Sequence, residues 1–228
     1  MNQVTETIAY FPQEGRKNLS ECLRLSFETA LQYELDKIII FTGVGDGLQE
    51  AIDKFLSQEC YSQIKLVGVT FAQGFEVRIN DEKTAPIFPD ERKVAFANRG
   101  IQIVRAHLPF DPISTQYQQH GVLAQDMSIV GNALNIFCGS MSLCIQAVLM
   151  ACDAGAVEIG EHVVVMTSDT SLLVRAAPTS RLLTDLVVRQ IICKPAFLTV
   201  TKAEKLSLTE GTEGPTIELP APETKQLG

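Results

Sequence analysis

The chain has 228 residues, of which 46% are hydrophobic, and a formal net charge of −8. This length suits one domain that buries a substantial core without disulfides. The acidic balance, with no block of Lys or Arg, argues against a nucleic acid partner. No apolar stretch reaches the ~18 residues of a membrane span, and Met1–Tyr10 lacks a signal-peptide pattern. We therefore expect a cytoplasmic protein with no membrane partner.

The first part of the chain alternates between helical and strand patterns. Residues 1–17 are mixed in character and predict an N-terminal arm. Apolar residues at three- and four-residue spacing predict a helix over Leu19–Leu35, and the same spacing returns over 48–56. Between and after these helices, Lys37–Phe41 and Ile64–Thr70 are short, β-branched and apolar on both faces, as in buried parallel strands.

The middle of the chain is less regular. Gly and Pro residues break 71–90, which we interpret as a loop over the strand ends, and 106–121 is a second irregular stretch. A helix at about 90–99 and a strand at Ile101–Val104 lie between them. Residues 128–154 are strongly apolar and predict either one buried helix or two helices broken near Gly139–Ser140.

The last third of the chain completes the sheet. Three more strands are expected at Glu161–Thr167, Leu172–Ala176 and Arg189–Cys193. From residue 201 the composition is polar and rich in turn residues, which predicts a flexible tail over 201–228. The sequence therefore predicts one α/β domain over 18–200, a three-layer, doubly wound, mostly parallel sheet with an antiparallel edge.

The turn Thr42–Gly47 is the strongest candidate site, because it joins a buried strand to a helix. Such a junction points the first free N–H groups of the helix at the carboxyl edge of the sheet, where the helix dipole favours anions. The glycines allow positive φ and close approach of a ligand. The alternative is a tight turn capped by Asp46, with glycines there for geometry alone. The string is neither a dinucleotide fingerprint nor a P-loop. The candidate residues are Thr42, Gly43, Val44, Gly45, Asp46 and Gly47.

Ligands of open α/β sheets bind at the carboxyl ends of strands, so residues after other strands are also candidates. They supply hydroxyls for phosphate oxygens, aromatic rings for stacking on a flat ligand, and one arginine for charge. A polar hairpin turn, core packing and a surface ion pair are the respective alternatives. These candidates are Thr70, Phe71, Gly74, Phe75, Thr167, Ser168 and Arg175.

Evidence for catalysis or metal binding in the sequence is thin, and the catalytic residues remain unknown. His107 follows a strand and is a candidate base, but loop histidines are usually ordinary surface residues. Asp153, in an Asp-Ala-Gly string, is interpreted as a carboxylate at a helix end. The six cysteines form no C-x-x-C pair, so we expect buried, reduced thiols and no metal site.

Several strings, taken in order, resemble the C-terminal α/β domain of pyruvate kinase, and especially free-standing proteins of that kind. The resemblance covers about residues 17–197. The strings are Asn18–Leu35, Ile38–Gly47, Val69–Thr70 with Gly74–Phe75, Arg99–Val104, Leu149–Gly155 and Ile191–Pro195.

The resemblance implies a function without implying kinase activity, because nothing here corresponds to the catalytic barrel. In pyruvate kinase this domain binds a sugar bisphosphate, and the turn after its first strand holds a phosphate. The free-standing relatives are similar to binders of phosphate-bearing ligands, with FMN among the candidates. Where relatives commonly show Lys and Glu one turn apart, this chain has Ser142 and Gln146.

We therefore expect a small-molecule binding protein that holds a phosphorylated or nucleotide-like ligand, FMN being one candidate, at Thr42–Gly47. The first alternative is an enzyme that uses a flavin or phosphate ligand in the same pocket. The second is an oligomeric structural or regulatory module, because the apolar segment 133–152 exceeds what one sheet face needs. We expect a homo-oligomer in any of these cases.

Overall fold

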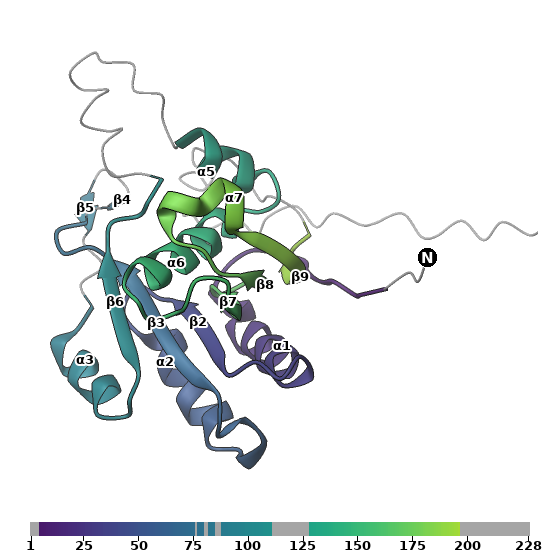
Figure 1. Ribbon diagram of the computed structural model, residues 1–228. Coiled ribbons are helices and arrows are strands. Elements are labelled where there is room, and N and C mark those ends of the chain that lie inside the picture. The colour runs from purple at the N-terminus through teal and green to yellow at the C-terminus, as the bar shows by residue number, and fades with distance from the viewer. Residues whose placement is uncertain (1–4, 76, 80–81, 85–87, 111–127, 197–228) are drawn as a thin grey trace, which may run out of the picture.

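The computed structural model describes residues 5–75, 77–79, 82–84, 88–110 and 128–196. The predicted tail over 201–228 lies outside these residues. A seven-stranded sheet has the order β1-β9-β8-β7-β2-β3-β6, and every strand except β8 runs in the same direction. Its strands are β1 (Ala9–Phe11), β2 (Lys37–Phe41), β3 (Lys65–Phe71), β6 (Gln102–Ala106), β7 (His162–Met166), β8 (Ser171–Arg175) and β9 (Val187–Pro195) (Figure 1).

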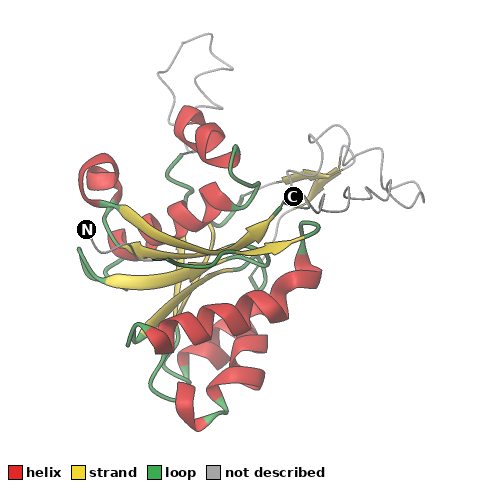
Figure 2. Ribbon diagram, turned by 90° about the vertical axis from the view of Figure 1, so that its right-hand side faces the viewer, coloured by secondary structure: helices red, strands yellow, loops and turns green. Residues whose placement is uncertain are grey.

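Helices cover both faces of this sheet and give three layers (Figure 2). The helical elements are η1 (Arg16–Asn18), α1 (Leu19–Gln32), α2 (Asp46–Ala51), η2 (Ile52–Leu56), η3 (Glu59–Tyr61), α3 (Asp90–Ala97), α5 (Ser128–Asn135), α6 (Met141–Asp153), η4 (Thr179–Arg181) and α7 (Leu182–Asp185). The predicted α/β class and mostly parallel sheet are confirmed.

Alternation along β2 explains why both faces need helices. Ile38 and Ile40 belong to the core with α1 and α2, whereas Ile39 and Phe41 belong to the core with α6. Successive side chains of a strand point to opposite faces, so an unbroken apolar run is stable only between two layers. β2 is therefore a central strand, with β3 on one side and β7 on the other.

Helix α1 ends earlier than the apolar pattern predicts. Tyr33 is its C-cap, and Glu34 takes a left-handed conformation with φ 54°. The N–H of Leu35 donates to the carbonyl of Ala30 at 2.8 Å, and that of Glu34 to Leu31 at 3.2 Å. This pair of bonds is a Schellman motif, which closes the helix although no glycine is present. The predicted end at Leu35 is thus three residues too far.

The long apolar segment forms two helices, α5 and α6, as one of the two interpretations had it. The break falls between Asn135 and Met141. Helix α6 ends at Asp153, and the N–H of Ala156 donates to the carbonyl of Ala151 at 2.9 Å. The positive φ of Gly155, 68°, fits this second Schellman closure.

Two segments that were predicted to be irregular, the N-terminal arm and the loop over 71–90, contain paired strands. Residues 9–11 of the arm are β1, which pairs in parallel with Cys193–Pro195 of β9. The stretch 71–90 contains the antiparallel pair β4 (Val77–Ile79) and β5 (Glu82–Thr84). Three-residue strands are too short to give a readable period, so sequence patterns miss them.

Candidate functional site

The candidate site lies at the carboxyl ends of β2 and β7, which pair in parallel. From β2 the chain continues to β3 and β6 on one side, and it returns to β7 on the other side. The loops after β2 and β7 therefore lead away from each other. Such a reversal in strand order opens a crevice at the edge of the sheet, where ligands of open α/β folds bind.

A pocket of about 280 Å³ occupies this crevice. Parts far apart in sequence line it: the segment before α1, the end of β2 with its glycine-rich turn, the start of α6, and the turn after β7. The lining residues are Arg16, Leu19, Ile40, Phe41, Thr42, Gly43, Val44, Asp46, Gly47, Ser140, Leu143, Thr167 and Ser168.

Hydrogen bonds fix the shape of the glycine-rich turn. The N–H of Gly45 donates to Thr42 Oγ1 at 2.9 Å, and Thr70 Oγ1 donates to the carbonyl of Gly43 at 3.2 Å. The turn is thus anchored to its own start and to β3. Because Thr42 Oγ1 accepts the bond from Gly45, the hydroxyl hydrogen of Thr42 is left for another acceptor.

Two glycines of the turn have packing reasons for being glycine. Gly45 has φ +93°, and a Cβ there would lie 2.9 Å from Phe96 Cε2 and 3.1 Å from Phe88 Cζ. A Cβ on Gly47 would lie 3.2 Å from Ile40 Cγ2, between α2 and the strand. Gly45 itself does not line the pocket. Geometry alone therefore accounts for Gly45, whereas Gly43 and Gly47 line the cavity.

Asp46 is paired with two arginines from different elements, Arg16 of η1 and Arg92 of α3. Arg16 Nη2 lies 2.7 Å from Asp46 Oδ2, and Arg92 Nη1 lies 2.5 Å from Asp46 Oδ1. The hydrogen bond from Arg92 and the charge of Arg16 lower the pKa of the Asp46 carboxyl, against the opposing effect of burial. The cluster has two cations and one carboxylate, so its net charge favours an anion despite Asp46.

The turn after β7 connects the pocket to the segment before α1. Asp169 is 3% exposed, and its Oδ2 accepts the N–H of Gly15 at 2.7 Å. Its Oδ1 accepts the hydroxyl of Thr170 at 3.1 Å. Asp169 therefore holds Gly15, and with it Arg16, beside the pocket.

Hydroxyl groups and helix ends give the pocket further donors. Ser140 and Ser168 line it, and neither hydroxyl makes a hydrogen bond within the described part of the chain. The first residue of α1, Leu19, and the N-cap of α6, Ser140, both lie on the pocket wall. The positive ends of two helices of 14 and 13 residues therefore lie at one cavity.

Of the predicted site residues, most of those that follow β2 and β7 line this pocket. The predicted residues of β8 and of the end of β3 and the turn after it do not line it. Thr70 donates a hydrogen bond to the carbonyl of Gly43 in the glycine-rich turn. Phe71 stacks on Phe75, with ring centroids 4.3 Å apart. Gly74 has φ +79° and no neighbour within 4 Å of an added Cβ. Because β8 runs opposite to β7, Arg175 pairs with His162 at the other edge of the sheet.

Arg16, Arg92 and Ser140 are functional candidates that the sequence did not single out. Arg16 and Lys17 precede α1 at its positive end, where cations are electrostatically unfavourable. Their position in the sequence could therefore have indicated a role other than helix stability. Ser140 adjoins the predicted helix break. Arg92 gave no signal, since only the folded chain brings α3 to the glycine-rich turn.

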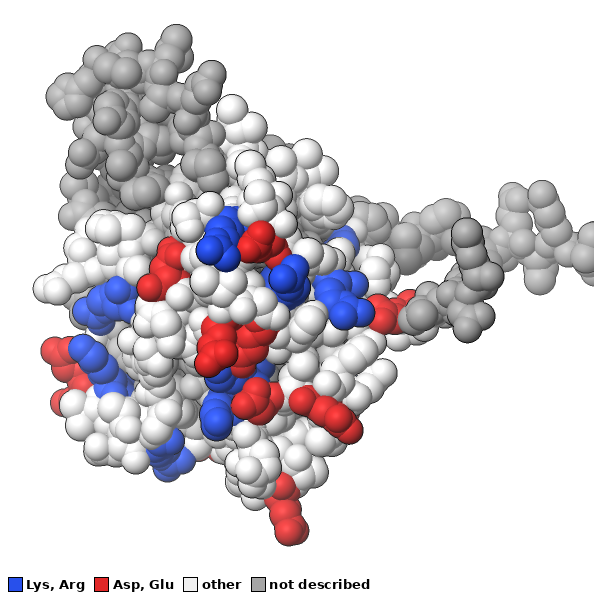
Figure 3. Space-filling model, viewed as in Figure 1, with Lys and Arg blue, Asp and Glu red and all other residues white. Residues whose placement is uncertain are grey.

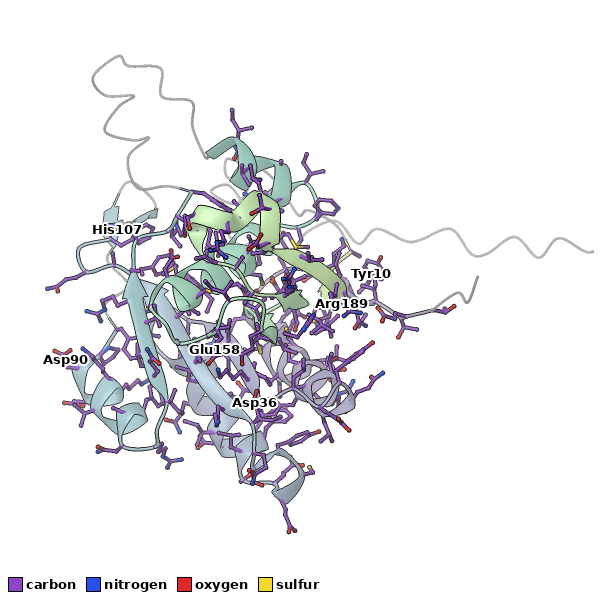
Figure 4. The ribbon with its side chains drawn as sticks, in the orientation of Figure 1. Tyr10, Asp36, Asp90, His107, Glu158 and Arg189 are labelled. Carbon is purple, nitrogen blue, oxygen red and sulfur yellow. The ribbon has the colours of Figure 1, made fainter. Side chains whose placement is uncertain are left out.

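Other residues considered from the sequence have structural roles or lie apart. Figure 4 shows His107 beyond the end of β6, which is two strands away from β2 in the sheet. Asp153 Oδ1 accepts the N–H of Thr179 at 2.9 Å. Ser142 Oγ donates to Asn135 Oδ1 at 2.7 Å, and Gln146 Oε1 accepts the N–H of Phe110 at 2.9 Å, so both tie α6 to neighbouring segments.

The cysteines are all free, and all except Cys60 are buried. Cys22 Sγ and Cys193 Sγ lie 3.5 Å apart behind the turn after β7. Burial raises the pKa of the Cys22, Cys138 and Cys144 thiols, which keeps them protonated and poorly reactive. Among the described residues, no group of three or more His, Cys, Asp or Glu side chains is placed to hold a metal ion.

The surface shown in Figure 3 carries basic and acidic side chains interspersed, without a large patch of either sign. Across the described ranges, none of the helices combines the length and apolar character that a membrane crossing requires.

No protein-family model matches the chain. Among solved structures, the chain is similar to a pyruvate kinase from Cryptosporidium parvum, with a TM-score of 0.34 and 12% sequence identity. The match covers 72% of this chain and 24% of the pyruvate kinase, so the chain spans about a quarter of that protein. A likeness this weak carries no argument about the family or the function of the chain.

Proposed function

We propose that the protein binds a small phosphorylated ligand in the pocket between the turns after β2 and β7. The observation that carries this proposal is the convergence of three features on one cavity: Arg16, the N-terminal ends of α1 and α6, and two serine hydroxyls that have no hydrogen-bond partner among the described residues. A phosphate group offers charge to the guanidinium and oxygens to the N–H and O–H donors.

The size of the pocket favours a small ligand. Its volume of about 280 Å³ lies just below the ~300–1,000 Å³ found for small-molecule sites. Its apolar side chains, which are Leu19, Ile40, Phe41, Val44 and Leu143, suit the carbon skeleton of a compact ligand. A sugar phosphate or a similar phosphate monoester fits this description.

The test is titration of the protein with ribose 5-phosphate and inorganic phosphate, followed by the melting temperature and by calorimetry. A ligand that binds only the folded state raises stability by RT ln(1 + [L]/Kd). Ser168→Glu places a carboxylate in the pocket and is expected to abolish binding. Ser62→Glu, at an exposed residue before β3, is the matched control. Binding that survives in the Ser168→Glu protein would place the ligand elsewhere and defeat the proposal.

FMN remains a ligand to test and has less support than a sugar phosphate. Phe41 is the aromatic side chain on the pocket wall and is only 9% exposed, while Phe71 and Phe75 stack on each other. A flavin-dependent enzyme needs this cofactor. Protein that stays colourless after incubation with FMN and removal of the excess would eliminate both the cofactor and that enzyme.

Self-association is a second candidate function, favoured by apolar exposure after the end of α5. Ile136 is 74% exposed and Phe137 is 54% exposed. Such neighbouring apolar side chains suit a contact between copies of the chain. Sedimentation of the wild type and of Ile136→Ser is the measurement. A monomer at all concentrations would remove this candidate.

We also propose that the domain is of the kind found at the C-terminus of pyruvate kinase, without kinase activity. The support is the order of the matching strings from Asn18–Leu35 to Ile191–Pro195. An experimental structure whose strand order differs from that of the pyruvate kinase domain would contradict this assignment.

A further inference from the structure

The segment between β1 and α1 forms one wall of the pocket and carries its cation. Among the described residues that line the pocket, Arg16 is the one with a positively charged side chain. This side chain is 71% exposed. Within the described residues, its polar partner is Asp46, at 2.7 Å. Arg16 is thus held by one exposed ion pair at the mouth of the cavity.

The position of Arg16 is unfavourable for helix stability. The short helix η1, which begins at Arg16, runs directly into α1, so Arg16 and Lys17 lie at the positive end of that helix. Acidic residues, not cations, are stabilising there. The ion pair with Asp46 offsets part of this cost for Arg16 and leaves its guanidinium at the mouth of the cavity, where an anion can reach it.

Arg92 is held differently from Arg16, although both contact Asp46. Arg92 Nη1 donates to Asp46 Oδ1 and also to the carbonyl of Val44 at 2.7 Å, and its side chain is 40% exposed. It therefore has two anchors on the turn and is not among the residues that line the cavity. Asp46 keeps a counter-ion when Arg16 moves away.

We infer that Arg16 exchanges Asp46 for the phosphate group of a bound phosphate monoester, while Arg92 stays on Asp46. This inference rests on the proposed function and names the residue that recognises the phosphate. The guanidinium forms two parallel N–H···O bonds to phosphate oxygens, which a point charge does not. The Asp169 carboxylate, by holding the N–H of Gly15 at 2.7 Å, is a positioning group for Arg16.

The inference is tested with inorganic phosphate as the probe, by calorimetry at constant ionic strength. Arg16→Ala is expected to weaken binding at least tenfold. Lys17→Ala is the matched control, since Lys17 is the adjacent exposed cation, does not line the pocket and bonds to Gln13; we expect a change within twofold. Asp46→Asn releases Arg16 without removing a cation and is expected to tighten binding several-fold.

The outcomes separate this inference from the proposed function. Wild-type protein that binds no phosphate defeats the proposed function itself. If Ser168→Glu abolishes binding while Arg16→Ala binds like Lys17→Ala, the pocket stands and the role of Arg16 is overturned. Should Arg16→Ala fail to fold, Asp46→Asn decides, because affinity equal to or below that of the wild type contradicts the exchange.

Discussion

The turn after β2 and the turn after β3 have similar positions in the fold but different roles. Each follows a buried parallel strand, and each contains a glycine with positive φ, Gly45 at +93° and Gly74 at +79°. Yet the first lines the pocket, whereas the second places Phe71 and Phe75 against each other beside Phe41. Strand order explains the difference. The turn after β2 lies at the point where the strand order reverses, because the chain goes from β2 to β3 on one side and later adds β7 on the other side. No such reversal occurs at β3, which lies between β2 and β6.

The comparison also shows that a glycine-rich string is not by itself a ligand signal. Gly45 is required by its φ and by the rings of Phe88 and Phe96, and these reasons involve no ligand. What distinguishes the first turn is its surroundings: the segment before α1, the start of α6 and the turn after β7 all reach it. Three predictions test this contrast.

The largest expected effect is on stability, at the two positive-φ glycines. Gly45→Ala combines an unfavourable φ with a Cβ only 2.9 Å from Phe96 Cε2, and we expect it to lower the free energy of unfolding by about 2–4 kcal/mol. Gly74→Ala has the same kind of φ without a neighbour within 4 Å, and about 1 kcal/mol is expected. Urea unfolding measures both. Equal losses in the two variants would show that packing against Phe88 and Phe96 is not what restricts Gly45.

The second prediction concerns the hydroxyls that face the pocket. Ser168→Ala removes a donor without filling the cavity, and we expect it to weaken phosphate binding about tenfold, in line with ~1.5–3 kcal/mol for hydrogen bonds to charged groups. Gln73→Ala, in the turn after β3, is the control and should leave affinity unchanged. Calorimetry of both variants gives the answer. A loss of affinity in Gln73→Ala would mean that the second turn also contributes to the site.

The smallest expected effect is the pH dependence of the Asp46 cluster. The arginines lower the pKa of Asp46 in the folded state, so its contribution is complete above the unfolded pKa, about 4, and is lost as the pH falls through the lower folded pKa. Asp46→Asn should therefore be less stable than the wild type at pH 7, by about 0.5–1 kcal/mol.

This difference should shrink towards zero as the pH falls below the unfolded pKa of about 4 and Asp46 becomes protonated in the wild type. Urea unfolding at pH 7 and at low pH measures it. Asp36→Asn is the control, because Asp36 is 57% exposed and lies 3.7 Å from Lys65. A difference between Asp46→Asn and the wild type that is independent of pH would exclude the ion pairs as its cause.

The central part of the fold was predictable, because buried parallel strands have strong sequence patterns. The strand Lys37–Phe41 was predicted with its observed bounds, and the break before α6 was one of two alternatives. The strands β1, β4 and β5 were missed because three-residue strands carry no period. The end of α1 was misplaced because Glu34 adopts a conformation that usually requires glycine.

The site was only partly predictable, and the reason is long-range contact. The turns after β2 and β7 could be nominated from strand ends alone. Arg92 could not, because its bond to the carbonyl of Val44 depends on how α3 packs against the turn. Arg175 was expected to lie near the site, but β8 reverses direction and carries it to the far edge.

The pairing of β1 with β9 has a consequence for the order of folding. These strands come from the two ends of the described chain, and residues 12–18, which carry Arg16, lie between β1 and α1. Contacts between segments so distant in sequence form late, because loop closure must precede them. During synthesis, β1 emerges before β9 and lacks this partner strand until β9 has been made. Docking of β1, which anchors one end of the Arg16 wall, is therefore among the last events of folding.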